Sequence, residues 1–187
     1  MKTTAVGAFK RLLKDYALVE SEKGDKSFRL IEKEKRSSNA GYEVLIYSCP
    51  KDTIAINCNY LPDRNKIFKS DMGVCRKSDY ILISTESMTV IAIELKKTYD
   101  ESKDDKTEEI RQQLTTSACF LDYCESIIGL FWGDKDILKG YSKHYVVCVP
   151  EESRKMPFYT NSQPPNNTPD SYIPVFGDEI HFHRLMI

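Results

Sequence analysis

The chain has 187 residues, 41% of them hydrophobic and 29% charged, with a formal net charge of −1 at pH 7. This length suits one hydrophobic core, and the composition excludes a disordered chain or a coiled coil. No apolar run reaches the roughly 18 residues that span a bilayer, and residues 1–12 lack the apolar stretch of a secretory signal, so we expect a cytoplasmic protein with no membrane partner.

The first predicted elements are a short helix and a series of strands. Apolar residues recur near a 3.6 period within 5–18, which predicts a helix. Segments 17–22 and 28–34 then form either a hairpin or a helix-to-strand connection. Two short Ile- and Val-rich strands, 42–49 and 53–58, follow with a turn between them. We expect these two strands to begin an antiparallel sheet.

A β-hairpin over 79–96 is the most informative pattern. Residues 79–84 and 89–96 are β-rich, and a four-residue loop joins them, so paired residues have numbers that sum to 173. Asp79 then lies opposite Glu94 on one face, and Lys96 shares that face. Three charged side chains are therefore expected to converge at one end of an otherwise apolar hairpin.

A long helix is predicted next, with Asp105 or Thr107 as its cap and acids in its first turn. The strand 144–149 should return beside the hairpin. An apolar stripe at steps of three and four supports the helix. The stripe consists of Ile110, Leu114, Ala118, Leu121, Cys124 and Ile128.

The remainder of the chain is rich in Pro and Asn. Prolines interrupt every periodic pattern from 150 to 178, and order resumes only in 180–187. We therefore predict one core domain over 1–149 and an irregular tail over 150–187, with room for a terminal strand. The tail is either irregular structure or a segment that a partner orders.

Cysteine and histidine do not indicate a zinc site. The six cysteines include no C-x-x-C pair, so reduced and mostly buried thiols are expected. His181 and His183 form an H-x-H with no second pair near them in sequence. We interpret both histidines as surface or core residues.

The charged end of the hairpin suits metal chemistry. Asp79 and Glu94, with the Leu95 carbonyl, would supply the oxygen ligands that Mg²⁺ or Mn²⁺ prefers. Lys96 would orient the attacking water and stabilise developing charge, an arrangement suited to phosphodiester hydrolysis. The alternative for the same residues is a surface salt bridge at a strand end.

A basic stretch directly precedes Asp79. Five cations and one acid, Asp71, lie between positions 64 and 77. We interpret the stretch as a nucleic-acid-binding surface, and the alternative is a solvated loop. Its cations are Arg64, Lys66, Lys69, Arg76 and Lys77.

Three sequence features together resemble the PD-(D/E)xK nuclease superfamily, also called restriction-endonuclease-like. They are Ser78-Asp79, the later Glu94-Leu95-Lys96 at the end of an Ile-rich strand, and Gln112-Gln113-Leu114 early in a helix. The resemblance covers roughly 79–149. It implies an α/β (α+β) fold in which helices flank a mixed sheet in the order α-β-β-β-α-β.

The resemblance also implies roles for individual residues. Asp79 and Glu94 would bind Mg²⁺, Lys96 would assist the attacking water, and Gln113 would support the site. Ser78 stands where the signature has proline. The acid that the superfamily often carries on its first helix has two candidates here, Glu20 and Glu22.

Two functions follow as hypotheses. The first is a nuclease that cleaves DNA more readily than RNA, with a homodimer or a partner subunit supplying target choice. The second is a binding or structural subunit with the same fold and a weakened site, in which 150–178 contacts the partner.

Overall fold

The computed structural model describes residues 3–22, 26–32, 41–61, 76–99, 104–153 and 165–186. Its helices are α1 (Ala5–Leu12) and α2 (Asp104–Trp132). The strands are β1 (Leu18–Val19), β2 (Phe28–Ile31), β3 (Glu43–Tyr47), β4 (Thr53–Asn57), β5 (Tyr80–Ser84), β6 (Thr89–Leu95), β7 (Ser142–Val149), β8 (Ile173–Phe176) and β9 (Glu179–His181). Short 3₁₀ turns cover Asp15–Ala17, Cys58–Tyr60, Glu151–Ser153, Pro169–Ser171 and Phe182–Leu185.

The strands form two sheets. The larger sheet has the order β1-β4-β5-β6-β7-β8, with antiparallel pairs from β1 to β6 and parallel pairs from β6 to β8. The smaller has the order β2-β3-β9. Helix α2 is the crossover between the parallel neighbours β6 and β7, as a parallel connection requires. The fold is therefore mixed α/β of the α+β class, as predicted.

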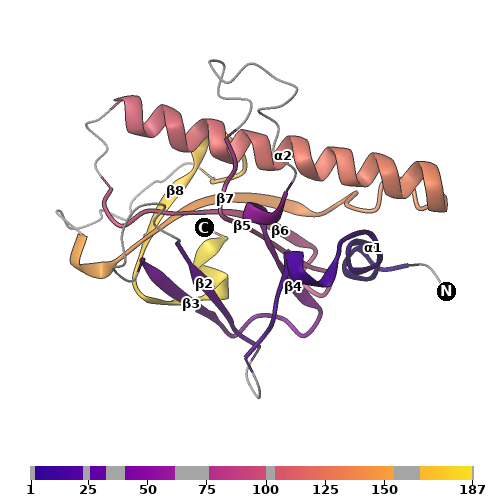
Figure 1. Cartoon of the computed structure of the whole chain (residues 1–187), viewed down its shortest axis with the longest axis horizontal. Coiled ribbons are helices and arrows are strands. Elements are labelled where there is room, and N and C mark those ends of the chain that lie inside the picture. The colour runs from indigo at the N-terminus through magenta and orange to yellow at the C-terminus, as the bar shows by residue number, and fades with distance from the viewer. Residues whose placement is uncertain are drawn as a thin grey trace.

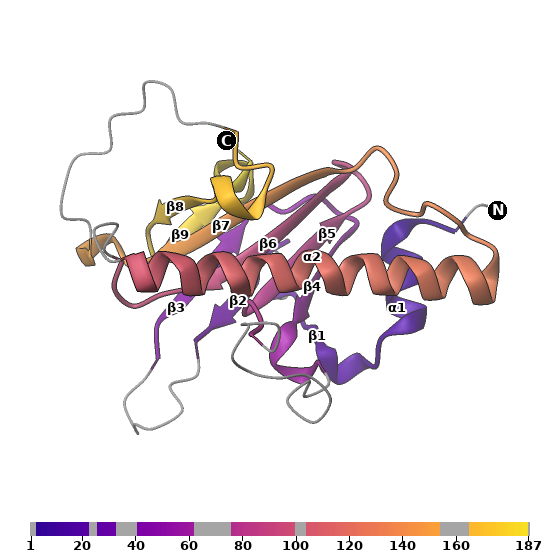
Figure 2. The same cartoon turned by 90° about the horizontal axis from the view of Figure 1, so that it is seen from above.

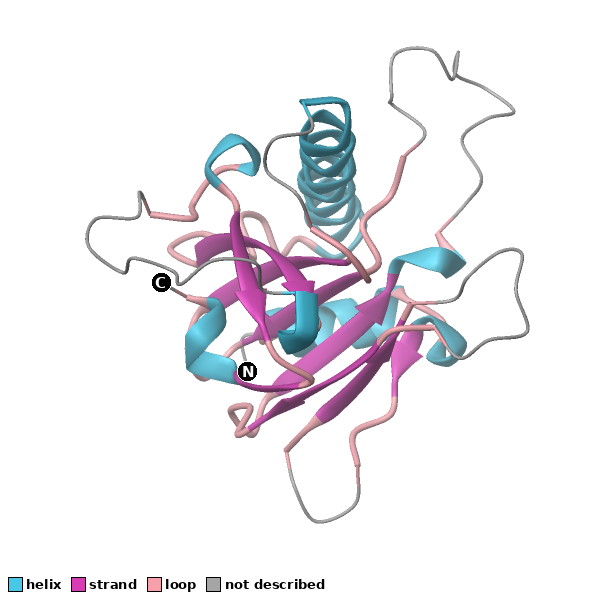
Figure 3. Cartoon of the chain, turned by 90° about the vertical axis from the view of Figure 1, so that its left-hand side faces the viewer, coloured by secondary structure: helices cyan, strands magenta, loops and turns pink. Residues whose placement is uncertain are grey.

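Three layers make up the core, because the strands of the larger sheet alternate their side chains between two apolar faces. Ile81, Ile83 and Val90 pack against both helices, whereas Leu82 and Ile91 pack against the smaller sheet. Figure 1 shows α2 above the larger sheet and β2 and β3 below it, and Figure 2 shows α2 running across the strands and past α1. Both helices thus cover one face, and strands instead of a helix cover the other (Figure 3).

The predicted hairpin and long helix are confirmed. Observed pairs such as Ile81–Ala92 and Ile83–Val90 have numbers that sum to 173. Residues 110, 114, 121, 124 and 128 of the α2 stripe are buried. Helix α2 begins at Asp104, so Asp105 and Thr107 lie inside its first turns instead of capping it. Two consecutive acids there interact favourably with the positive end of the helix dipole.

Two predictions for the first third of the chain are wrong. Strands β3 and β4 do not pair with each other, since β3 joins the smaller sheet and β4 the larger. The chain changes sheet at Ser48, whose φ is 55°, and the next amide, that of Cys49, donates to the Lys26 carbonyl at 2.8 Å. The predicted helix over 5–18 is too long, since α1 ends at Leu12 and the chain continues into β1. Of the two alternatives for 17–22 and 28–34, a strand pair is not formed, because β1 and β2 enter different sheets.

The C-terminal segment is more ordered than predicted. Strand β8 pairs in parallel with β7 in the larger sheet, and β9 pairs in parallel with β3 in the smaller sheet. The segment 173–181 therefore contributes one strand to each sheet. The prediction of an irregular 150–178 is therefore wrong over β8. Pro174 is compatible with this strand because β8 lies at the edge of the sheet, where a residue without an amide proton interrupts no hydrogen bonds between strands. Residues 154–164 of the predicted tail lie outside the described ranges.

None of the helices in the described ranges combines the length and the apolar character needed to cross a bilayer.

Five cysteines lie in the described ranges, and each is a free thiol. Cys119 is exposed and the other four are buried, as expected for reduced structural thiols.

Candidate active site

Main-chain bonds fix Asp79 beside the end of β6. Its amide donates to the Ile93 carbonyl at 3.1 Å, which extends the β5–β6 ladder by one residue. Its Oδ2 accepts the Leu95 amide at 2.8 Å. The half-buried Asp79 carboxylate is therefore held against the strand segment that carries Glu94, on the sheet face that α2 covers.

Glu94 is a buried carboxylate with one oxygen unpaired. The residue is only 1% exposed, because it lies on the helix-covered face of a central strand. Its Oε1 is 2.7 Å from Nζ of Lys96, whose side chain is 25% exposed. Its Oε2 is buried without a hydrogen-bond partner among the described residues. A buried unpaired carboxylate oxygen is costly, so it marks a place where a ligand would be stabilising.

Gln113 reaches the same place from α2. Its Nε2 donates to the Lys77 carbonyl at 3.2 Å, and its Oε1 is buried without a described partner. Its side-chain amide also acts on Glu94, where it lowers the carboxyl pKa. The structure thus brings Asp79, Glu94, Lys96 and Gln113 together.

A ladder of contacts ties the extended residues before Asp79 to α2. Nη1 of Arg76 lies 3.4 Å from Oε1 of Glu109, and the Lys77 carbonyl accepts from Gln113. In the third rung the hydroxyls of Ser78 and Ser117 share a buried hydrogen bond. The helix partners are four residues apart, so they lie on one face of α2. We name this contact set the α2 ladder.

Burial and mutual charge shift the ionisation of the site. Burial is the main reason that the pKa of Asp79 rises to about 6, against which the Leu95 amide and Lys96 act. Burial and then the charge of Asp79 raise the pKa of Glu94 well above its usual value. For Lys96, burial alone would lower the pKa, but the charge and hydrogen bond of Glu94 outweigh it and the pKa is raised. Lys96 is therefore an ammonium at neutral pH.

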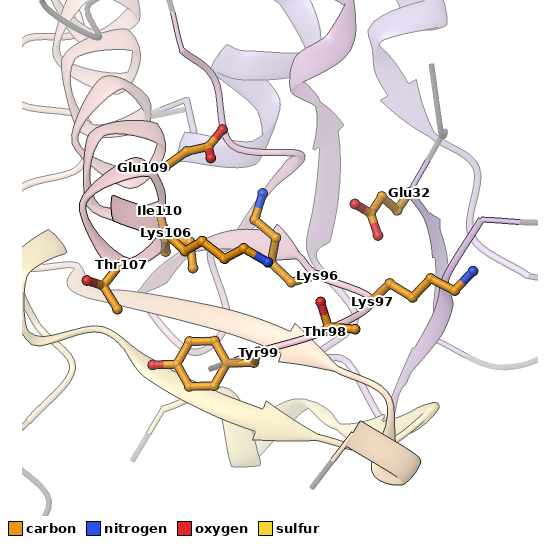
Figure 4. Close-up of a pocket in the computed structure, with 9 residues that line it drawn as sticks. All are labelled: Glu32, Lys96, Lys97, Thr98, Tyr99, Lys106, Thr107, Glu109 and Ile110. Atoms are coloured by element: carbon orange, nitrogen blue, oxygen red, sulfur yellow. The ribbon is translucent and has the colours of Figure 1, made fainter. Parts of the chain in front are cut away.

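A pocket of about 220 Å³ opens in front of Lys96. Figure 4 shows the Lys106 side chain extending toward Lys96, whose ammonium points upward between Glu109 on α2 and Glu32 on the opposite side. Tyr99 and Thr98, which follow β6, line the remaining wall. The pocket gives Lys96 access to a ligand outside the protein.

The donor set fits a hard divalent ion that keeps most of its water. Asp79 and Glu94 are two carboxylates, and Mg²⁺ commonly takes one or two from a protein. Over the ranges that the structure covers, no group of three or more His, Cys, Asp or Glu is placed to hold a metal. The Leu95 carbonyl as a third ligand stays a prediction, since the bond described for Leu95 with Asp79 uses its amide.

The acid expected on the first helix is absent from α1, whose sequence is AVGAFKRL. Glu20 is exposed beyond β1, and Oε1 of Glu22 forms an ion pair with Arg29 at 2.6 Å. Neither residue therefore occupies the predicted position on a helix.

The predicted basic surface is only partly described. Arg64, Lys66 and Lys69 lie outside the described residues. Arg76 pairs with Glu109, and Lys77 is half-buried, with its Nζ donating to the Leu61 carbonyl at 2.6 Å. Both cations therefore contact the protein itself, and their contact with nucleic acid stays a prediction.

The sequence patterns missed Ser117 and Lys106. Ser117 is polar yet 2% exposed, and its position one turn after Gln113 is the signal that could have identified it. Lys106 lies in a strongly charged segment, where no sequence pattern distinguishes it from its neighbours. His181 and His183 contact each other, with 2.6 Å between their Nδ1 atoms, at the end of β9 and in the turn that follows it.

The site was also compared with known proteins. No protein-family model, no curated protein and no solved structure matches this chain.

Proposed function

We propose that this protein is a divalent-metal-dependent nuclease that hydrolyses phosphodiester bonds, with a preference for DNA by analogy with the superfamily that it resembles. The observation that carries the proposal is the unpaired Oε2 of Glu94, a nearly inaccessible carboxylate beside a second one, Asp79. Lys96 neutralises part of this charge through Oε1 alone. A divalent cation would offset the remainder.

Mg²⁺ or Mn²⁺ fits this role, with Asp79 and Glu94 holding it. When bound, such an ion lowers the pKa of water and polarises a phosphoryl oxygen. The order of the elements that build the site also supports the proposal. Strands β4, β5 and β6 of the larger sheet are followed by α2 and β7, which resembles the β-β-β-α-β part of the superfamily order, while β1, β2 and β3 lie between α1 and β4.

Lys96 acts as an electrostatic group and not as a base, because its raised pKa keeps it protonated. In the reaction a water oxygen forms a bond to phosphorus while the bond to the leaving oxygen breaks. Negative charge then grows on the phosphoryl oxygens. An ammonium held by a buried carboxylate is already oriented toward this charge and needs no reorganisation.

Gln113 is the fourth member of the site. Its amide donates to the Lys77 carbonyl, which holds the side chain near Glu94, where it lowers the carboxyl pKa. Partners of the ligand carboxylates commonly set metal affinity and activity in this way.

Target choice would come from a second copy or from a partner subunit, because a single core leaves little surface for recognition. The outer side of α2 is suited to such a contact. Leu130 and Phe131 there are 81% and 76% exposed, and Tyr123 is exposed two turns earlier. Exposed apolar side chains that cluster in this way are typical of protein–protein contacts.

A direct test is a time course with plasmid, linear DNA, single-stranded DNA and RNA, in Mg²⁺, Mn²⁺ or EDTA. We expect cleavage with either ion and none with EDTA. Lys96→Ala should reduce turnover by about 10²-fold while ion binding, measured as a thermal shift, is nearly retained. Lys139→Ala, which removes an exposed lysine beyond the end of α2, is the control. A wild type that is inert on all four substrates with both ions would favour the binding-subunit hypothesis.

A further inference from the structure

We infer that the pocket in front of Lys96 binds a phosphate group of the substrate strand, with Lys106 as the main contact. This inference rests on the proposed nuclease function and adds a second phosphate position beside the one that is cleaved. The group is either an internal diester or a terminal monoester, which share the same chemistry in the pocket.

Lys106 is the first observation. It lies in the first turn of α2, is exposed, and forms no ion pair with any described residue. Arg76 and Lys77 near the same site are instead bonded to Glu109 and to the Leu61 carbonyl. Figure 4 shows the Lys106 side chain extending across the pocket toward Lys96. Lys96 is already paired with Glu94 at 2.7 Å, so Lys106 is the cation at this pocket whose charge has no acid paired with it among the described residues, and an anion would be attracted to it.

The surroundings of the two lysines also favour an anion. The pocket lies at the N-terminal end of α2, a helix of 29 residues, where the helix dipole is positive. Two acids line it as well, Glu32 and Glu109. Glu109 is neutralised by Arg76 at 3.4 Å, and Figure 4 places Glu32 on the opposite side from Lys106. The two acids therefore lie at the margins of the pocket among the described residues, and Lys106 extends across it.

The size and position of the pocket suit a phosphate group of a nucleic-acid strand. The pocket of about 220 Å³ is several times the roughly 30 Å³ that one water occupies in the liquid, so a phosphate group fits with its attached oxygens. Lys96 belongs both to the pocket and to the carboxylate pair. A phosphate in the pocket would therefore lie next to the reacting one on the same strand.

The first experiment measures binding without turnover. Inorganic phosphate is titrated into the metal-free protein, and the lysine side-chain NMR signals are followed. We expect saturable shifts in the wild type, in Lys106→Arg and in the control Lys139→Gln, which removes an equally exposed lysine. Lys106→Gln should lose most of the shift. Saturable binding that Lys106→Gln leaves unchanged would overturn the inference.

The second experiment measures cleavage of oligonucleotides with a 5′-phosphate, a 3′-phosphate or neither. Lys106→Gln should raise KM about 10-fold with kcat within about twofold, because the contact is made equally in the ground and transition states. The logarithm of the binding constant decreases linearly with the logarithm of the salt concentration, and the magnitude of this slope should be smaller by about one in Lys106→Gln. An effect on all three substrates identifies an internal diester, and an effect confined to one phosphorylated end identifies a terminal monoester.

The two proposals fail separately. If the wild type cleaves and Lys106→Gln has the same KM and salt slope, the phosphate pocket is wrong and the nuclease function stands. If no substrate is cleaved but phosphate binding depends on Lys106, the pocket stands as an anion site and the nuclease function is wrong.

Discussion

Ser78 and Ser117 share a hydrogen bond in the interior, and this bond joins the residue before Asp79 to α2 one turn after Gln113. Ser117 also donates to the Gln113 carbonyl at 3.3 Å. Ser78 thus carries a side chain that anchors the segment before β5 to the helix. The α2 ladder therefore holds Asp79 in place through contacts between two elements.

Ser117→Ala tests this anchor. We expect a loss of about 1–2 kcal/mol in the free energy of unfolding, because the buried Ser78 hydroxyl keeps only its weak contact of 3.9 Å with Sγ of Cys58. The Mn²⁺-induced rise in Tm should also shrink, since Asp79 is held less firmly. Ser126→Ala is a matched control on the same helix, because Ser126 makes the same type of bond, to the Asp122 carbonyl, on the exposed side. Equal effects of the two variants on the Mn²⁺ response would argue against a positioning role.

Asp79→Asn tests the raised pKa. Above its folded pKa of about 6 the Asp79 carboxylate is charged and destabilises the metal-free protein. The stabilising protonated form is complete only below the unfolded value of 3.8 and is lost as the pH rises through 6. The variant should therefore be more stable than the wild type at pH 7–8 by up to about 3 kcal/mol, and the difference should vanish near pH 4. Asparagine keeps an acceptor for the Leu95 amide.

Urea unfolding in the presence of a chelator, at steps from pH 4 to 8, measures this difference. Asp134→Asn, in the loop beyond α2, is the matched control for the removal of one carboxylate. With saturating Mn²⁺ the order should reverse at pH 7–8, because the ion stabilises only the wild type. A difference that grows toward low pH would have the wrong sign and would rule out burial as the cause of the shift.

Gln113→Ala tests the fourth site residue. We expect kcat to fall about 10-fold with a change in unfolding free energy below about 1 kcal/mol, as for a group that orients a ligand carboxylate. The neighbouring Gln112→Ala is the matched control, because Gln112 donates to Glu108 at 3.0 Å on the exposed side of α2. A similar loss in both variants would indicate a general effect on the helix.

Ile180→Ala tests the place of the C-terminal segment in the core. Ile180 is fully buried between the two sheets, so its truncation should cost roughly 2–5 kcal/mol. Glu179→Ala, at an exposed position of the same strand, should change stability by less than about 0.5 kcal/mol. Chemical unfolding measures both, and a negligible cost at Ile180 would indicate a loosely attached tail.

Local patterns were sufficient for the hairpin and for the members of the site. A four-residue loop fixes the register of β5 and β6, and the period of two then places Asp79, Glu94 and Lys96 on one face. Gln113 follows from its position beside the apolar stripe of α2. In both cases the information lies within about 20 residues of sequence.

Pairing between distant segments could not be predicted in this way. Whether β3 continues beside β4 or changes sheet depends on the left-handed conformation of Ser48, and serine carries no strong preference for it. Strand β8 contains a proline and is short, so its sequence alone favours a loop. It forms a strand because it pairs with β7 at the edge of the larger sheet. The ladder bond at Ser117 was missed for a similar reason, because its partner Ser78 belongs to another element.

The parallel pairing of β9 with β3 has a consequence for how the molecule is made. The Tyr42 hydroxyl donates to the Gly177 carbonyl across a sequence separation of 135 residues, beside the contact between these two strands. During translation, β2 and β3 are synthesised well before β9, so the hairpin that they form lacks its third strand until then. Its apolar face is exposed during that time, so the nascent chain should fold slowly and depend on chaperones until residue 181 emerges.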